Sequence, residues 1–351
     1  MRIIQFDKEE SNIKDFINLP KKIYTDKTST ENEERVKQLL TGNHLLSIYF
    51  RLNKFLIYKK GEVVGRYVIT EYHDDKDTCY LGFFECINDE EVSSFMFDEI
   101  YKFAKEKKYK RIIGPVDASF WIKYRLKTNQ FDKLPYTSEP YNADYYYDMF
   151  LNNGYEVIEH YTSNIYDKNN STYNEEDYKE TYNKIDESGY KIVKPRIIEE
   201  FDRCLDDIYY LIRESYSKSP VFKELEKDDF IQLFKKYEKI INLNMIRIAY
   251  YKDKVVGFCI SIPNYGNKVY SSNFLDKIGN MWTKTKPKEY IVQYLEDSSD
   301  HPGLAKAISY SIAEELKKTN VSGISAIVKN DNSKIDNNDQ FEYVLLERKI
   351  N

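Results

Sequence analysis

The stretch Phe55-Leu-Ile-Tyr-Lys-Lys-Gly-Glu-Val-Val-Gly-Arg-Tyr-Val-Ile69 decides the fold, because its pattern occurs twice in the chain. Runs of β-branched and aromatic residues flank a short polar turn, which predicts a β-hairpin. Ile246-Arg-Ile-Ala-Tyr-Tyr-Lys-Asp-Lys-Val-Val-Gly-Phe-Cys-Ile-Ser-Ile262 repeats the pattern in the second half, again with Val-Val-Gly after the turn. A repeat on this scale indicates two domains of similar architecture.

The segments that follow the two hairpins also correspond. In the first half, a strand at 80–85 precedes a helix whose apolar residues recur at three-and-four spacing, and then a strand at 111–114. A strand at 289–295, a helix from Gly303 and a strand at 322–328 follow the second hairpin in the same order. The sequence therefore predicts an α/β (mixed-sheet) fold with two domains, 1–168 and 190–351, joined by a polar linker and bridging helix at 169–189.

Composition limits the function. The 351 residues carry 53 basic and 58 acidic side chains, a net charge of −5, which gives no general electrostatic footprint for nucleic acid or an anionic membrane. No apolar stretch approaches the length of a membrane span, and no leader pattern opens the chain, so we expect a cytoplasmic protein with no membrane partner. The four cysteines and four histidines are dispersed, which predicts buried thiols and neither disulfides nor a metal site.

Several short motifs carry a resemblance to a known family. Val64-Gly65-Arg66, Gly82-Phe83-Phe84-Glu85, Gly114-Pro115 and Pro140-Tyr-Asn-Ala-Asp-Tyr-Tyr146 resemble a bacterial family of tandem GNAT-like proteins, the Gcn5-related N-acetyltransferases. Val255-Val-Gly-Phe258 and Ile262-Pro-Asn264 extend the resemblance to the second half. The order and spacing of these motifs, across nearly the whole chain, carry the resemblance. The resemblance implies two tandem GNAT-like (acyl-CoA N-acyltransferase) domains.

The resemblance also implies a cofactor loop. In GNAT enzymes, backbone amides of a Gly-rich loop before a helix hold the pyrophosphate of coenzyme A, because an unpaired helix start attracts anions. The corresponding segment is Asp300-His301-Pro302-Gly303-Leu304-Ala305, which makes His301, Gly303, Leu304 and Ala305 candidates for binding acetyl-CoA. Asp300 and Asp297 depart from the family pattern, since a carboxylate repels phosphate. The alternative is that Ser299 or Asp300 simply caps the helix.

The first half lacks that loop and the usual acid. Ile87 to Ser93 has no glycine and three carboxylates, so coenzyme binding is not expected there. Phe150 stands where the resemblance implies a general-acid tyrosine, and a phenyl ring has no proton to give. In the second half, the resemblance implies Glu296 as a general base and Tyr343 as the nearest phenol, with Glu85 the matching carboxylate of the first half. Solvated surface carboxylates and a core tyrosine are the competing interpretations.

An aromatic segment suggests where a substrate binds. Rings with a nearby guanidinium suit a pocket that stacks on a ligand and hydrogen-bonds it. The candidate substrate-binding residues are Trp121, Arg125, Tyr136, Asn142, Tyr145 and Tyr146. With 33 tyrosines in the chain, ordinary core packing is the alternative.

The expected function is N-acetyl transfer from acetyl-CoA to an amine of a small molecule or peptide. The second domain would hold the cofactor, and the first would be a degenerate copy that shapes the acceptor site. The first alternative is a non-catalytic binding protein that lost the cofactor loop, which the acidic loops favour. The second is an aminoacyl-type transferase, which the net negative charge disfavours because a tRNA needs a basic track.

Overall fold

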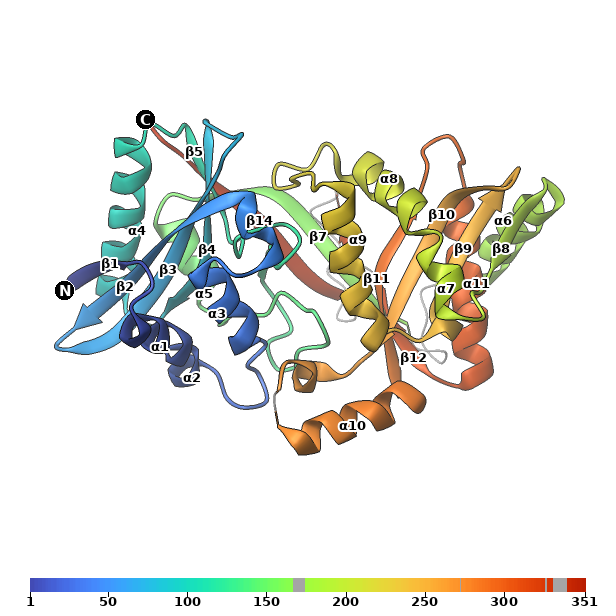
Figure 1. Ribbon diagram of the computed structural model, residues 1–351, viewed down its shortest axis with the longest axis horizontal. Helices are drawn as coiled ribbons and strands as arrows, with labels where there is room; N and C mark the ends of the chain where they lie inside the picture. Colours follow the sequence, from blue (N-terminus) through green and yellow to red (C-terminus); the bar gives the residue numbers. More distant parts are fainter. Residues whose placement is uncertain (167–173, 272, 326, 331–339) are drawn as a thin grey trace. The chain divides into compact units, whose positions relative to one another are not determined.

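The computed structural model describes residues 1–166, 174–271, 273–325, 327–330 and 340–351 (Figure 1). The chain divides into two compact units. The first contains the described residues of 1–162 together with 329–330 and 341–351. The second contains those of 163–328 together with Gln340.

The first unit is a mixed sheet with helices packed against it. Its strand order is β1-β2-β3-β4-β5-β14-β7, and β6 pairs with β14. β4 and β5 pair in parallel, from Thr78 opposite Arg111 to Tyr80 opposite Ile113. The elements are β1 (Arg2–Phe6), α1 (Glu10–Asn18), α2 (Pro20–Ile23), α3 (Glu33–Thr41), β2 (Phe50–Lys59), β3 (Glu62–Tyr72), β4 (Thr78–Cys86), α4 (Glu90–Glu106), β5 (Arg111–Gly114), β6 (Leu126–Lys127), α5 (Tyr146–Asn152), β7 (Glu156–Tyr166) and β14 (Gln340–Lys349).

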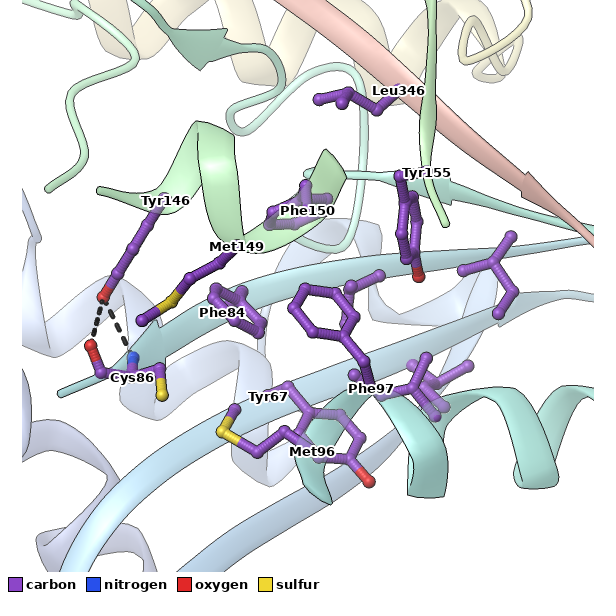
Figure 2. Close-up of a cluster of buried hydrophobic side chains, with 14 of the residues drawn as sticks. Tyr67, Phe84, Cys86, Met96, Phe97, Tyr146, Met149, Phe150, Tyr155 and Leu346 are labelled. Carbon is purple, nitrogen blue, oxygen red and sulfur yellow. Dashed lines mark hydrogen bonds between the residues drawn. The ribbon is translucent and has the colours of Figure 1, made fainter. Parts of the chain in front are cut away.

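An aromatic core joins α4 and α5 to the sheet, as Figure 2 shows. The ring centroid of Phe97 in α4 lies 5.1 Å from that of Phe84 in β4 and 5.0 Å from that of Phe150 in α5. It lies 5.3 Å from the ring centroid of Tyr155. Such offset and edge-on pairs add to the gain from removing large rings from water. Phe150, at the position where the resemblance implies an acid, is fully buried in this core.

The ladder between β4 and β5 ends at Tyr80 and Ile113, and the chain after β5 stays close to β4. A side chain at Gly82 would place its Cβ 1.9 Å from the carbonyl oxygen of Val116, so only glycine allows this close approach. The last part of β4 pairs with β3 on one edge, and on the other edge it contacts Asp117 and Tyr146 of the segment 115–146. This arrangement positions the candidate site.

The second unit repeats the topology. Its strand order is β12-β11-β10-β9-β8, with β11 and β12 parallel, and the end of β7 pairs with β12. Helix α6, expected as a linker, forms ion pairs with α11 through Lys306–Asp177 and Lys317–Glu175 and is part of this unit. The elements are α6 (Glu175–Glu187), β8 (Tyr190–Val193), α7 (Ile198–Asp202), α8 (Leu205–Tyr216), α9 (Lys227–Lys235), β9 (Ile246–Tyr251), β10 (Lys254–Pro263), α10 (Phe274–Thr285), β11 (Glu289–Asp297), α11 (Leu304–Thr319), β12 (Ser322–Ile324) and β13 (Val328–Lys329).

The repeated order confirms the predicted fold class, and all four cysteines are buried and free, as expected. The terminal strand differs from the expectation. β14, which the sequence assigns to the domain 190–351, pairs with β5 and β6 in the first unit. Alternating apolar residues predict a strand here but do not specify its partner, because pairing depends on distant residues.

Substitutions of two core leucines, one in each unit, test this division of the chain into units. Leu346→Ala in β14 should destabilise the first unit by about 2–5 kcal/mol, because Leu346 is fully buried against its core. Hydrogen exchange should then rise in β5 and α4. The matched variant Leu316→Ala empties a core position on α11 and should raise exchange in β9 to β11. Faster exchange of the second unit in Leu346→Ala would contradict the assignment of β14.

Candidate functional site

Strained backbone marks the place where β4 leaves β5 in the first unit. Phe83 has a φ of 47°, which is rare for a bulky residue, and its amide donates to Asp117 at 2.5 Å. Ala118 and Arg125 of the neighbouring segment also have positive φ values, 63° and 86°. Non-glycine residues in such conformations cost free energy and concentrate at functional sites. These backbone conformations make the end of β4 a candidate functional site.

A buried cluster of charges lies beside Phe83. Arg66 of β3 is fully buried and pairs with Glu31 through both terminal nitrogens of its guanidinium. Lys123 pairs with Asp117 at 2.9 Å. Glu85 of β4 lies 3.7 Å from Arg66 and is the third carboxylate of the cluster. Each cation has a closer carboxylate, so Glu85 has the longest ion pair of the three.

Burial raises the pKa of Glu85, and the nearby Arg66 charge, which acts in the opposite direction, offsets this only in part. The phenol of Tyr146 donates a hydrogen bond to Glu85 at 2.6 Å. Burial, followed by the charge of Glu85, also raises the pKa of Tyr24 well above its ordinary value. A carboxyl with a raised pKa is a stronger base than an ordinary one, which suits it to accept a proton from a ligand.

Two tyrosines hold the end of β4. Figure 2 shows the hydroxyl of Tyr146 against the backbone of Cys86, where it accepts from the amide at 3.0 Å and lies 3.3 Å from the carbonyl oxygen. Tyr145 donates to the same carbonyl at 2.9 Å. These bonds satisfy backbone groups that have no strand partner on this side.

The space enclosed here is small. A cavity of about 20 Å³ lies between β4 and the segment 115–146. That volume suits one water molecule or a group of similar size, such as a primary ammonium. Its lining residues are Tyr24, Phe83, Phe84, Glu85, Pro115, Asp117, Lys123, Arg125, Leu126, Tyr141, Asn142, Tyr146 and Phe150.

The predicted substrate-binding residues all lie in the first unit, and three of them, Arg125, Asn142 and Tyr146, line this cavity. The guanidinium of Arg125 stacks over Tyr124 and Tyr161. The side chain of Asn142 accepts from the backbone amide of Lys127 and donates to its carbonyl. Trp121 and Tyr136 are buried but do not line the cavity, and Tyr145 acts on it only through the Cys86 carbonyl.

In the second unit, carboxylates accept hydrogen bonds from backbone amides in and just before the predicted cofactor loop. Asp297 accepts from the amide of Ala305 at 2.9 Å, and Glu214 of α8 accepts from the amide of Ser299 at 3.1 Å. The amides of Ser298, His301 and Leu304 donate to backbone carbonyls. Burial raises the pKa of Asp297, whereas hydrogen bonds from Ser299 lower the pKa of Glu214.

The other residues predicted for this loop have local roles. Gly303 begins α11 with a φ of 87°, a conformation that suits glycine. His301 Nδ1 lies 2.7 Å from the hydroxyl of Tyr190. Leu304 is fully buried, and Glu296 lies half-buried on β11 opposite Phe258.

Tyr343 requires a correction. The sequence assigns it to the second domain as the nearest phenol, but β14 from Phe341 onward belongs to the first unit. Tyr343 is fully buried, lies 2.7 Å from the Tyr136 hydroxyl and donates to Glu139 at 2.9 Å. Burial first, then the neighbouring Tyr136 and Glu139, raise the pKa of Tyr343 far above its ordinary value. These contacts fit a core residue.

Sequence reasoning missed Glu31, Asp117 and Lys123 as site residues. All three lie in loops, and no local pattern brings them toward β4. Arg66 was visible only as part of a motif, although a charged residue between apolar ones in a strand is a signal of a buried charge.

Comparisons with known proteins agree with the fold. A tandem GNAT protein from the clavulanic acid biosynthesis pathway matches all of this chain and 98% of its own, with a TM-score of 0.51 and 8% identity. A GCN5-related N-acetyltransferase from Sphaerobacter thermophilus matches 99% of this chain and 96% of its own (TM-score 0.52, 8% identity). The fold is that of a tandem GNAT protein. A probable N-acyltransferase from Enterococcus faecalis matches 99% of this chain and 72% of its own (TM-score 0.54, 12% identity).

The likeness to these tandem GNAT proteins is structural. No protein-family model matches the chain, and no curated protein matches it. Identities of 8–12% show a shared fold without identifying the substrate.

Proteins with the GNAT fold typically use acetyl-CoA, whose pyrophosphate needs unpaired amides at a helix start. In the second unit, Asp297 occupies the amide of Ala305 in the predicted loop, and Glu214 binds the amide of Ser299 just before it. In the first, Asp89 accepts from the amide of Val92 and is followed by Glu90 and Glu91. Carboxylates in these positions repel phosphate. Neither described loop fits the group.

The raised pKa of Glu85 predicts a pH dependence. The folded protein retains a proton that the unfolded chain has released, from about pH 4.5 up to the raised pKa. The free energy of unfolding should therefore fall as pH rises through this window. Glu85→Gln should remove that part of the fall, so urea unfolding at successive pH values should increasingly favour the variant. The exposed Glu156→Gln is the control, and an identical slope in Glu85→Gln and wild type would refute the assignment.

Proposed function

We propose that the first unit binds the primary amine of a small molecule or peptide beside Glu85 and prepares it as an acyl acceptor. The observation that carries the proposal is the buried and weakly paired carboxylate at the end of β4. Glu85 lies 3.7 Å from Arg66, whereas Arg66 pairs more closely with Glu31 and Lys123 pairs with Asp117 at 2.9 Å. A ligand ammonium would give Glu85 a closer positive charge.

Size and chemistry agree with this ligand. A cavity of about 20 Å³ admits a group the size of an ammonium and excludes a bulky one. The rest of the ligand would extend outward past the rings of Tyr24 and Tyr141, which line the same space.

The raised pKa gives Glu85 a chemical role beyond pairing. An ammonium has no lone pair and cannot attack an acyl group, so an acceptor amine must first lose a proton. Glu85 is positioned to take it, with the Tyr146 phenol fixing the carboxylate at 2.6 Å. The proposed role of Glu85 concerns the acceptor amine alone, because the described loops do not fit a coenzyme.

The amine proposal is tested by ligand-induced stabilisation. A panel of primary alkylamines, a diamine, an amino sugar and a dipeptide is compared with the alcohols or N-acetyl derivatives of the same skeletons. At least one amine should raise the Tm, and its neutral counterpart should not. Glu85→Gln should weaken that amine's binding at least tenfold, because it removes the opposing charge. The variant's circular dichroism spectrum serves as the folding control.

Two results would sink the amine proposal. One is an equal shift with amines and their neutral counterparts, and the other is undiminished amine binding by folded Glu85→Gln. Glu156→Gln, an exposed carboxylate of the same unit, should bind like wild type.

Acetyl-CoA binding by His301, Gly303, Leu304 and Ala305 stays a prediction of the sequence, and the capped amides weigh against it. Calorimetric titration of acetyl-CoA into the wild-type protein should give no micromolar binding. Micromolar binding that is lost in Gly303→Glu would restore the sequence-based expectation. Its absence, together with amine binding, would favour the alternative of a binding protein without acetyl transfer.

A further inference from the structure

Helix α10 of the second unit presents a large apolar surface to solvent. Phe274 is 73% exposed, Leu275 72%, Met281 70% and Trp282 65%, with Ile278 also exposed. The helix has no buried residue. Contiguous exposed apolar surface of this kind marks an interaction site, whereas scattered exposed side chains do not.

The five side chains lie on one face. At about 100° per residue, positions 274, 275, 278, 281 and 282 fall within an arc of about 120°. The opposite side carries Asp276, Asn280 and Thr283. α10 is therefore strongly amphipathic over its 12 residues.

The polar side attaches α10 to its own unit. Asn280 donates to the carbonyl of Lys268 at 3.0 Å, and Lys284 donates to the carbonyls of Lys239 at 2.9 Å and Glu238 at 3.3 Å. A core helix usually packs through its apolar face, whereas α10 contacts its unit through its polar side. Figure 1 shows α10, in orange, at the periphery of the unit.

Positive charge surrounds the apolar face. The segment 268–288 contains five lysines (Lys268, Lys277, Lys284, Lys286 and Lys288) and a single acidic residue, Asp276, in a chain with a net charge of −5. This local excess is opposite in sign to the whole protein. It favours an anionic partner, and it disfavours a second copy of α10, which would carry the same charge.

We propose that α10 binds the surface of an anionic lipid bilayer, with its apolar face in the boundary between headgroups and acyl chains. Phe, Leu, Met and Trp on one side with lysines at the border are the features of helices that lie in this interface. Lysines can reach the anionic headgroups while their stems cover apolar surface. Among the described residues no helix is long and apolar enough to cross a membrane, so the contact is peripheral.

Vesicle co-sedimentation tests the proposal on the full chain. The wild-type protein should bind vesicles of phosphatidylglycerol and phosphatidylcholine at low salt, bind pure phosphatidylcholine at least tenfold more weakly, and dissociate as salt rises. Phe274→Ser with Met281→Ser should lower binding at least tenfold. Lys277→Gln with Lys286→Gln and Lys288→Gln should remove most of the preference for anionic vesicles.

The chain offers a matched control and a built-in reporter. Ile48→Ser with Leu134→Ser removes two side chains of the first unit that are 66% and 61% exposed, and it should leave binding unchanged. Trp282 is one of two tryptophans, and Trp121 is buried. Fluorescence emission should therefore shift to shorter wavelength on vesicle binding. Trp282→Phe should abolish the shift while co-sedimentation persists.

Each contrary outcome overturns the proposal. No sedimentation of the wild type with anionic vesicles at low salt would do so, as would equal binding to neutral vesicles. An equal loss in the Ile48/Leu134 variant would show that binding is not specific to α10. Dissociation of a wild-type dimer by Phe274→Ser with Met281→Ser, in the absence of vesicle binding, would assign the face to self-association.

Discussion

Backbone amides without a secondary-structure partner are the constraint on which both candidate sites depend. Buried amides must find an acceptor, and two places in the fold leave them exposed: the end of β4 and the start of α11. This chain satisfies them with its own side chains. Asp117 and Tyr146 take the amides of Phe83 and Cys86, and Asp297 takes that of Ala305. The same geometry that could hold a ligand anion thus holds carboxylates and phenols.

The two units use this constraint differently. At α11, Asp297 accepts from the amide of Ala305 in the first turn, and its carboxylate leaves the loop unsuited to a phosphate. At β4, Glu85 is held beside Arg66 in an ion pair longer than those of the neighbouring carboxylates, and this is the feature on which the proposed amine site rests.

Local sequence patterns predicted the elements well and their long-range partners poorly. The two hairpins, the helix after Gly303 and the strand ending at Glu85 could be read from periodicity and turn residues. The partner of β14 could not, because strand pairing is set by distant residues. Nor could the cluster around Arg66, whose members come from separate loops. The face of α10 has the periodicity of a core helix, and only the structure shows that it is exposed.

The buried charges of the first unit are not explained by stability. Removing ions from water costs free energy that pairing only partly returns, and apolar side chains of similar volume usually serve a core as well or better. The strained φ of Phe83 adds a further cost at the same place. Lys123, Asp117 and the strained Phe83 line the same water-sized cavity as Glu85, whereas the fully buried ion pair Lys127–Glu139 lies outside its lining. Ion pairs and backbone strain beside a carboxyl with a raised pKa support our proposal that this end of β4 binds a ligand.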